Sequence, residues 1–206
     1  MPSTPSAPTR TVGSYEVGYL PRQGGNVAEW TGLAIFRSDR MVGEFNGNET
    51  IAYRILKGEL QQATLTVSEI NKPGHLFTVS IAQSRNPIIR TSFKNGRATI
   101  DLSLEVEADL ITTISPESLE TSQQVAKIEK AIAYSLEVWL DSTLQKAQNW
   151  GSDVFGFGEH FRRYFLTWQE WTKTDWPEVF KKAEIRYDLS VHIRRPGLII
   201  HTVPAV

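Results

Sequence analysis

Two glutamates two residues apart, Glu105 and Glu107, are the side chains in this sequence best placed for acid–base chemistry. Residues i and i+2 of a β-strand point to the same face, so the two carboxyl groups would be neighbours. Glycosidases use such pairs at separations of about 5 to 9 Å. However, Leu102, Leu104 and Val106 alternate with the acids, which is typical of a sheet with one face in water. We favour the solvated face, with a hydrolase that uses Glu105 and Glu107 as an alternative.

The histidines, a short glycine loop and the lack of cysteine limit the remaining chemistry. Without cysteine there are no disulfides, thiolate nucleophiles or cysteine-based zinc sites. No two histidines show His-x-x-x-His spacing; they are His75, His160, His192 and His201. Gly156-Phe157-Gly158 superficially fits a dinucleotide loop, but Phe161 occupies the third glycine position and a helix precedes it. We predict no catalytic residue, metal or cofactor, and interpret the glycines as a tight turn between packed helices.

Aromatic residues gather in one region of the chain. Five of the six tryptophans lie there: Trp139, Trp150, Trp168, Trp171 and Trp176. Phe161, Phe165 and Trp168 recur at helical spacing, which predicts that they form a stripe of the core. Core packing explains most of this cluster.

A contact surface is the second interpretation of the aromatic region. Trp171 and Trp176 have more polar neighbours in the sequence, so we expect them to be partly exposed. Exposed aromatic rings often anchor protein partners, and a neighbouring guanidinium pairs with acids or stacks on rings. The partner-contact residues that we predict are Arg162, Arg163, Trp171 and Trp176.

One long helix must position these residues. Ser115-Pro116-Glu117 has the cap hydroxyl, proline and acid that start a helix, and Gly151 can end it. The positions between them form a continuous apolar stripe; they are Val125, Ile128, Ile132, Leu136, Trp139 or Leu140, Leu144 and Ala147. A helix of roughly 30 residues is about 45 Å long and needs a partner to cover its stripe.

Strands supply that partner. A hairpin is expected from Glu29–Arg37 and Met41–Phe45, followed by a short helix from Asn48 to Lys57 that Gly58 closes. Further strands are expected around Leu65–Val67 and Phe77–Ile81 with a turn at Asn71–Gly74, at Pro87–Phe93 and Ala98–Ala108 around Asn95-Gly96, and at Glu184–Arg194. These elements predict an α+β fold: a mostly antiparallel twisted sheet packed against a long helix in the C-terminal half, with shorter helices.

Composition limits the class of protein further. Residues 1–28 are rich in Pro, Gly, Ser and Thr, so we predict a linker-like segment there and a single α+β domain over 29–206. The start Met-Pro-Ser-Thr-Pro suggests a cut placed within a linker. With 40% apolar residues and a net charge of −1, a soluble domain without affinity for nucleic acid is expected. No membrane-spanning run or export signal is visible.

Several ordered blocks resemble one known family. They are EWTGLAIFRSDRMVG (Glu29–Gly43) with Asn48–Thr50 and Lys57–Gly58, AQNWGSDVFGFGE (Ala147–Glu159), Trp176–Phe180 and VHIRRPG (Val191–Gly197). Over residues 29–198, this arrangement resembles the C-terminal domain of Ger(x)C-type spore germination lipoproteins, the C subunits of germinant receptors.

The resemblance implies a function that residue chemistry alone does not. Members of this family are lipid-anchored through an N-terminal cysteine on the outer face of the spore inner membrane. They act with a multi-spanning A subunit and a transporter-like B subunit in nutrient-triggered germination, and the family has no established catalytic residues. The signal peptide and anchor cysteine are not found in this chain. The resemblance therefore implies a non-catalytic protein-interaction domain, with a small-ligand (germinant) binding module as the alternative.

Overall fold

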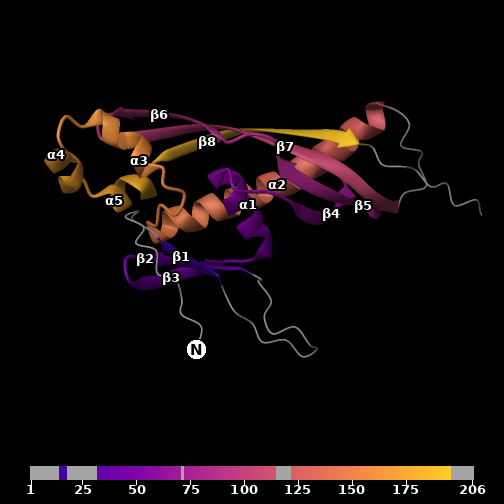
Figure 1. Cartoon of the computed structure of the whole chain (residues 1–206), viewed down its shortest axis with the longest axis horizontal. Helices are drawn as coiled ribbons and strands as arrows, with labels where there is room; N and C mark the ends of the chain where they lie inside the picture. Colours follow the sequence, from indigo (N-terminus) through magenta and orange to yellow (C-terminus); the bar gives the residue numbers. More distant parts are fainter. Residues whose placement is uncertain (1–13, 18–31, 71, 115–121, 196–206) are drawn as a thin grey trace, which may run out of the picture.

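The computed structural model describes residues 14–17, 32–70, 72–114 and 122–195, which form two sheets and several helices (Figure 1). The predicted α+β class is confirmed: the sheets are mostly antiparallel, and one long helix dominates the second half of the chain. The predicted helix start at Ser115–Glu117 lies outside the described residues.

The smaller sheet contains three antiparallel strands in the order β1-β2-β3. They are β1 (Ser14–Val17), β2 (Leu33–Arg37) and β3 (Arg40–Phe45). The predicted hairpin is β2–β3, in which Leu33 pairs with Phe45. Of the predicted linker-like segment 1–28, the structure describes β1, which pairs with β2 along its whole length. The division into 1–28 and 29–206 stays a prediction.

The larger sheet is built around β7 (Arg97–Ile114). The other strands are β4 (Ala63–Glu69), β5 (Lys72–Gln83), β6 (Ile88–Lys94) and β8 (Glu184–Arg195). On one edge of β7, β6 pairs with its first half and β5 with its second half, both antiparallel. On the other edge, β8 runs parallel to β7. The predicted turn at Asn71–Gly74 is shorter than expected, because β5 begins at Lys72.

The predicted turn between β6 and β7 is confirmed. Asn95 and Gly96 both have positive φ angles, 51° and 74°. Two consecutive positive φ values match the right-handed twist of a two-residue hairpin, and Asn-Gly adopts them at the lowest cost. This hairpin tip lies at the end of the molecule that also holds the short C-terminal helices (Figure 1).

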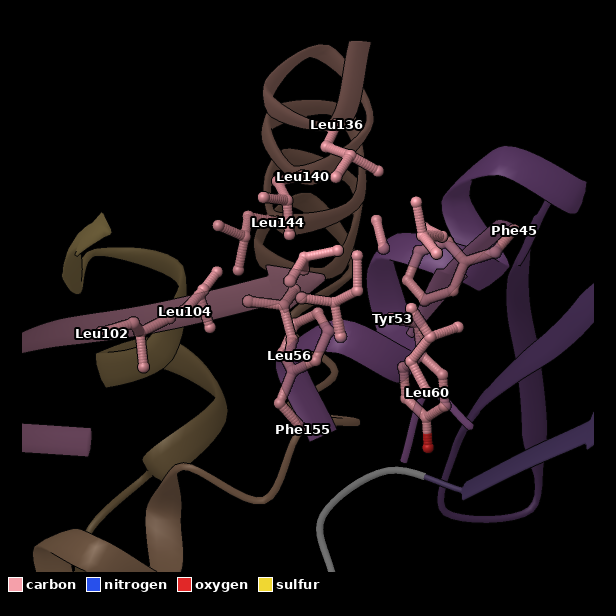
Figure 2. Packing of buried hydrophobic residues seen from close by; sticks show 14 of the residues in the cluster. Phe45, Tyr53, Leu56, Leu60, Leu102, Leu104, Leu136, Leu140, Leu144 and Phe155 are labelled. Atoms are coloured by element: carbon pink, nitrogen blue, oxygen red, sulfur yellow. The ribbon is translucent and has the colours of Figure 1, made fainter. Parts of the chain in front are cut away.

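Two helices lie between the sheets. Helix α1 (Gly47–Lys57) starts at a capping box in which Asn46 and Glu49 bond to each other's amide, and Gly58 ends it. Helix α2 (Ser122–Trp150) contains the predicted apolar stripe and crosses the larger sheet diagonally (Figure 1). In Figure 2, Leu136, Leu140 and Leu144 of α2 lie beside β7 and α1. All three leucines are buried in a core cluster that includes residues of both sheets.

Four short helices replace the single aromatic helix that the spacing suggested. They are α3 (Gly158–Phe161), η1 (Arg162–Tyr164), α4 (Trp168–Lys173) and α5 (Trp176–Lys181). Phe161 is buried as predicted, but the core assignment of Trp168 is wrong, because 56% of its surface is exposed. The backbone is extended at Phe165 (φ −110°, ψ 133°), which breaks the helical relation between Phe161 and Trp168.

Candidate contact surface

Glu105 and Glu107 do not form an acid–base pair. Both lie on the face of the larger sheet that is turned away from the core, and each forms an ion pair with a different arginine. Glu105 pairs with Arg85, and Glu107 lies 2.6 Å from the guanidinium of Arg194. Both carboxyl groups remain partly exposed, which is the geometry of a solvated sheet face. The hydrolase alternative therefore has no support from the structure.

The other chemical candidates are also structural. Over the described residues, no group of three or more histidine or acidic side chains is arranged to hold a metal ion. In the glycine loop, Phe155 and Phe157 are buried, as the packing interpretation expects. A Cβ on Gly158 would lie 2.7 Å from Nε1 of Trp176, so this glycine allows the close approach of the indole.

Asp153 is the buried centre of this loop. Its Oδ1 accepts a hydrogen bond from the Phe157 amide (3.0 Å), and its Oδ2 accepts from the Gly158 amide (2.6 Å) and from Nε1 of Trp176 (2.8 Å). Burial raises the pKa of Asp153, while the bonds from Gly158, Trp176 and Phe157 act to lower it. One carboxyl group thus satisfies three buried donors and fixes Trp176 to the end of the glycine loop.

Trp176 is an internal residue, so the prediction that it is partly exposed is wrong. Its exposed fraction is 4%, because the indole N–H is bound by Asp153 and the ring packs among other rings. The ring centroid of Phe161 lies 4.8 Å away and that of Trp171 lies 5.6 Å away. Trp171, which is half-buried, also contacts Phe165 at 5.4 Å. Trp176 therefore supports Trp171 from beneath.

An exposed aromatic and basic surface lies above this stack. We call it the cap surface; its residues are Arg162, Arg163, Tyr164, Leu166, Trp168 and Trp171. Leu166 is 95% exposed and Trp168 is 56% exposed, and the Arg162 guanidinium lies 4.6 Å from the ring centroid of Trp168. Arg163 donates to Oγ1 of Thr91 in β6 (2.9 Å), and the Tyr164 hydroxyl bonds to the Thr91 carbonyl. These bonds attach the cap surface to the sheet.

Three cap residues, Tyr164, Leu166 and Trp168, were not among the predicted contact residues. The sequence contains a usable signal for them in Thr167-Trp168-Gln169-Glu170. This is a Ser/Thr-x-x-Glu start pattern: Oγ1 of Thr167 accepts from the Glu170 amide, and the Glu170 carboxylate accepts from the Leu166 amide. A helix that starts at Trp168 cannot continue the stripe of Phe161. Leu166 then lies in the connection just before this helix, where it is exposed.

The clefts in the described part of the chain include two of moderate size. One, of about 560 Å³, lies between the β6–β7 hairpin tip and α5; its charged lining residues are Arg97, Asp175, Glu178, Lys182 and Glu184. The other, of about 590 Å³, lies beside the end of α1 and is lined mostly by polar residues that include Arg54, Glu59 and Arg85. Neither is the apolar cleft that typically holds a small molecule.

Comparison with known proteins settles the family. The family model described as "Spore germination B3/ GerAC like, C-terminal" matches residues 31–197, which is most of the chain. The chain belongs to this family. The resemblance seen in the ordered sequence blocks is thereby confirmed. The match includes the glycine loop, all four short helices and β8.

Curated proteins named as spore germination proteins are similar to most of this chain. Spore germination protein GerQC of Bacillus cereus is 22% identical over 186 residues, covering 87% of this chain and 50% of that protein. Spore germination protein YndF of Bacillus subtilis (strain 168) is 24% identical over 176 residues, covering 83% of this chain and 43% of that protein. The chain spans about half the length of the curated relatives it matches.

The fold is also found in a solved structure. The crystal structure of the GerBC protein matches 89% of this chain and 57% of that chain, with a TM-score of 0.71 and 21% sequence identity. At this identity the likeness shows a shared fold. Over the residues that the structure describes, no helix has both the length and the apolar character needed to cross a membrane.

Proposed function

We propose that this chain is a non-catalytic protein-interaction domain of a germinant receptor C subunit. In this role it contributes to nutrient-triggered spore germination together with the A and B subunits. The GerAC-like family match and the similarity to named spore germination proteins support the proposal. We further propose that the full-length subunit is held on the outer face of the spore inner membrane through a lipid anchor, as the family resemblance implies.

The observation that carries this proposal is the exposure of large apolar side chains on a rigidly attached segment. Leu166 is almost fully exposed and Trp168 is more than half exposed, and the Arg162 guanidinium is already stacked on the Trp168 ring. Tryptophan and arginine are the residues most enriched at the energetic centres of protein interfaces. We place the partner contact at the cap surface, with Arg162, Arg163 and Trp171 in it. Trp176 acts indirectly by supporting Trp171.

Replacing Leu166 by Ser and Trp168 by Ala together should weaken recovery of the A and B subunits with this subunit by more than about tenfold. Removing a central aromatic contact typically costs about 2 kcal/mol or more of binding energy. Both side chains contribute little to the core, so the thermal unfolding midpoint should change little. The measurement is crosslinking yield from spore membranes, together with the germination rate of the same spores.

A matched control is available on the outer face of α2. Tyr134 and Val138 are similarly exposed, at 60% and 49%, and lie far from the cap surface along the sequence. The pair Tyr134→Ala and Val138→Ser should leave recovery and germination unchanged. Normal receptor assembly and germination in the Leu166–Trp168 variant would contradict the placement of the contact.

The alternative function, binding of a small ligand, is favoured by one feature only. The cleft between the hairpin tip and α5 presents both charge signs, with Arg97 and Lys182 opposed by Glu178 and Glu184. Such a lining suits a zwitterion such as an amino acid. Because Glu178 and Glu184 are already paired with Lys181 and Arg186, we expect no saturable heat when amino acids are titrated into the domain. Saturable binding that Lys182→Ala abolishes would favour the alternative.

A further inference from the structure

Strand β8 has one edge that no strand occupies among the described residues. It pairs with β7 alone, over most of its length. The Ile193 amide bonds instead to the side chain of Glu129 in α2 (2.9 Å), so this amide points away from β7. Backbone groups of a strand alternate between its two edges. The amides and carbonyls of Ile185, Tyr187, Leu189 and Val191 therefore face the same open edge as that of Ile193.

Apolar side chains accompany this open edge. Ile185, Tyr187, Leu189 and Ile193 lie on the side of β8 that faces α2, yet each is only half-buried. By contrast, Leu102 and Leu104, their neighbours on β7, are fully buried. A strand added beside β8 would bury these apolar side chains, just as β8 buries Leu102 and Leu104 of β7. The edge is thus incomplete in packing as well as in hydrogen bonding.

Acidic side chains of α2 contact the row at two points. Glu129 lies at Ile193, and Asp141 accepts a hydrogen bond of 2.6 Å from the Tyr187 hydroxyl. Glu137 lies one helical turn before Asp141, and its carbonyl is 3.3 Å from the same hydroxyl. Burial and the bond to Asp141 raise the pKa of Tyr187. Tyr187 and Ile193 are separated by about 20 Å of strand at 3.3 Å per residue.

We propose that the open edge of β8 binds an extended segment of a partner protein, which adds to the sheet as a further strand. The recognised segment carries basic residues at positions i and i+6, opposite Asp141 and Glu129, and apolar residues at i+2 and i+4. These four side chains share one face of the added strand. Backbone hydrogen bonds supply the affinity, and the acids and the apolar row supply the specificity. This surface is distinct from the cap surface.

A second copy of this chain fits the edge poorly. In the antiparallel register centred on Ser190, two β8 strands related by a twofold axis would place Ile193 of one copy opposite Tyr187 of the other. Glu129 of one copy would then face Asp141 of the other at both ends, and like charges across paired strands are destabilising. The charges on the opposite face of β8 do not block the edge either, because Arg186 and Arg194 pair within the sheet with Glu184 and Glu107.

The test uses a short peptide, Lys-Thr-Val-Thr-Val-Thr-Lys with blocked ends, titrated into the ¹⁵N-labelled chain. We expect saturable shifts in the amide resonances of Ile185, Tyr187, Leu189 and Val191. Leu189→Lys should abolish them, because it places a charge on β8 opposite the centre of the added strand. Ser190→Lys is the matched control: its side chain lies on the opposite face of the sheet, and binding should persist.

Charge reversal provides a second variant that does not touch the core. Glu137 is exposed on α2, so Glu137→Lys should fold normally. It should lower the affinity for the lysine peptide by about threefold, as expected for exposed ion pairs. It should raise the affinity for a peptide in which glutamates replace the two lysines. Absence of shifts at the four β8 amides at millimolar peptide would overturn the proposal. So would equal binding of both peptides, or self-association of the chain that Leu189→Lys removes.

Discussion

Replacing Asp153 by alanine is expected to lower the free energy of unfolding by at least about 3 kcal/mol. The substitution leaves the Phe157 amide, the Gly158 amide and the Trp176 indole without their acceptor, and all three are buried. Each orphaned buried donor costs about 1 to 3 kcal/mol. Part of this loss is returned, because the buried carboxyl group no longer has to be desolvated. Urea denaturation followed by tryptophan fluorescence measures the change.

Two further substitutions test whether the loss comes from this network. Trp176→Phe keeps the ring in the core but removes the indole donor, so it should be non-additive with Asp153→Ala by about 0.5 to 3 kcal/mol in a double-mutant cycle. Asp175→Ala removes a neighbouring acid that only caps α5, and should cost about 1 kcal/mol. Strict additivity of the Asp153 and Trp176 substitutions would show that their bond does not position the aromatic stack.

The parts of the fold that local chemistry determines could be predicted from the sequence. The Asn95-Gly96 turn, the apolar stripe of α2 and the two-residue period of β8 each depend on residues close together in the chain. Helix α1 also follows from local signals, although its N-cap is Asn46 and lies slightly earlier than expected. These predictions are correct because the local preferences of the sequence agree with the tertiary structure at these positions.

The features that depend on distant partners could not be predicted. Nothing near β8 indicates that it runs parallel to β7, whose paired residues lie about 85 positions earlier in the chain. For a similar reason, the sequence predicts Trp176 to be partly exposed and Trp168 to be buried, whereas Trp176 is buried and Trp168 is exposed. Burial of Trp176 depends on an acceptor at Asp153, and exposure of Trp168 depends on the helix restart at Thr167. Only the second has a signal in the sequence.

The candidate site illustrates the same limit. The sequence identifies the aromatic region, and the structure divides it into an internal stack around Trp176 and an exposed cap surface around Trp168. The two layers are coupled through Trp171, which contacts Trp176 and Phe165. A substitution in the internal layer should therefore disturb the exposed layer, whereas the Leu166–Trp168 pair should affect the surface alone. Comparing the two separates a loss of contact from a loss of fold.

Replacing Glu49 by alanine is expected to lower the free energy of unfolding by about 2 to 3 kcal/mol. Glu49 is 3% exposed; it bonds to the Asn46 amide and to the Ser142 hydroxyl (2.7 Å), and Nζ of Lys146 lies 2.8 Å from both carboxylate oxygens. Loss of the cap costs about 1 kcal/mol. Loss of the ion pair with Lys146 accounts for the rest of the destabilisation. This part is smaller than the 3 to 5 kcal/mol typical of breaking a fully buried pair, because the Lys146 side chain is partly exposed and can be solvated by water. Glu44→Ala, an exposed acid nearby, is the matched control.

The pH dependence of stability should distinguish Glu49 from Asp153, because their pKa values are shifted in opposite directions. Burial alone would raise the pKa of Glu49, but the bonds from Lys146, Ser142 and Asn46 hold it below the ordinary value of 4.5. Its contribution is therefore complete above pH 4.5 and is lost as pH falls through the folded-state pKa. The stability difference between the native chain and Glu49→Gln should shrink on acidification.

Asp153 should show the reverse trend. Its folded-state pKa is raised above 3.8 by burial, so the folded state holds this proton more tightly than the unfolded state does. Its contribution is complete below pH 3.8 and declines as pH rises through the folded-state value. The difference between the native chain and Asp153→Asn should therefore shrink toward neutral pH. Denaturation curves at several pH values measure both slopes, and slopes of the same sign would contradict the assignment of opposite pKa shifts.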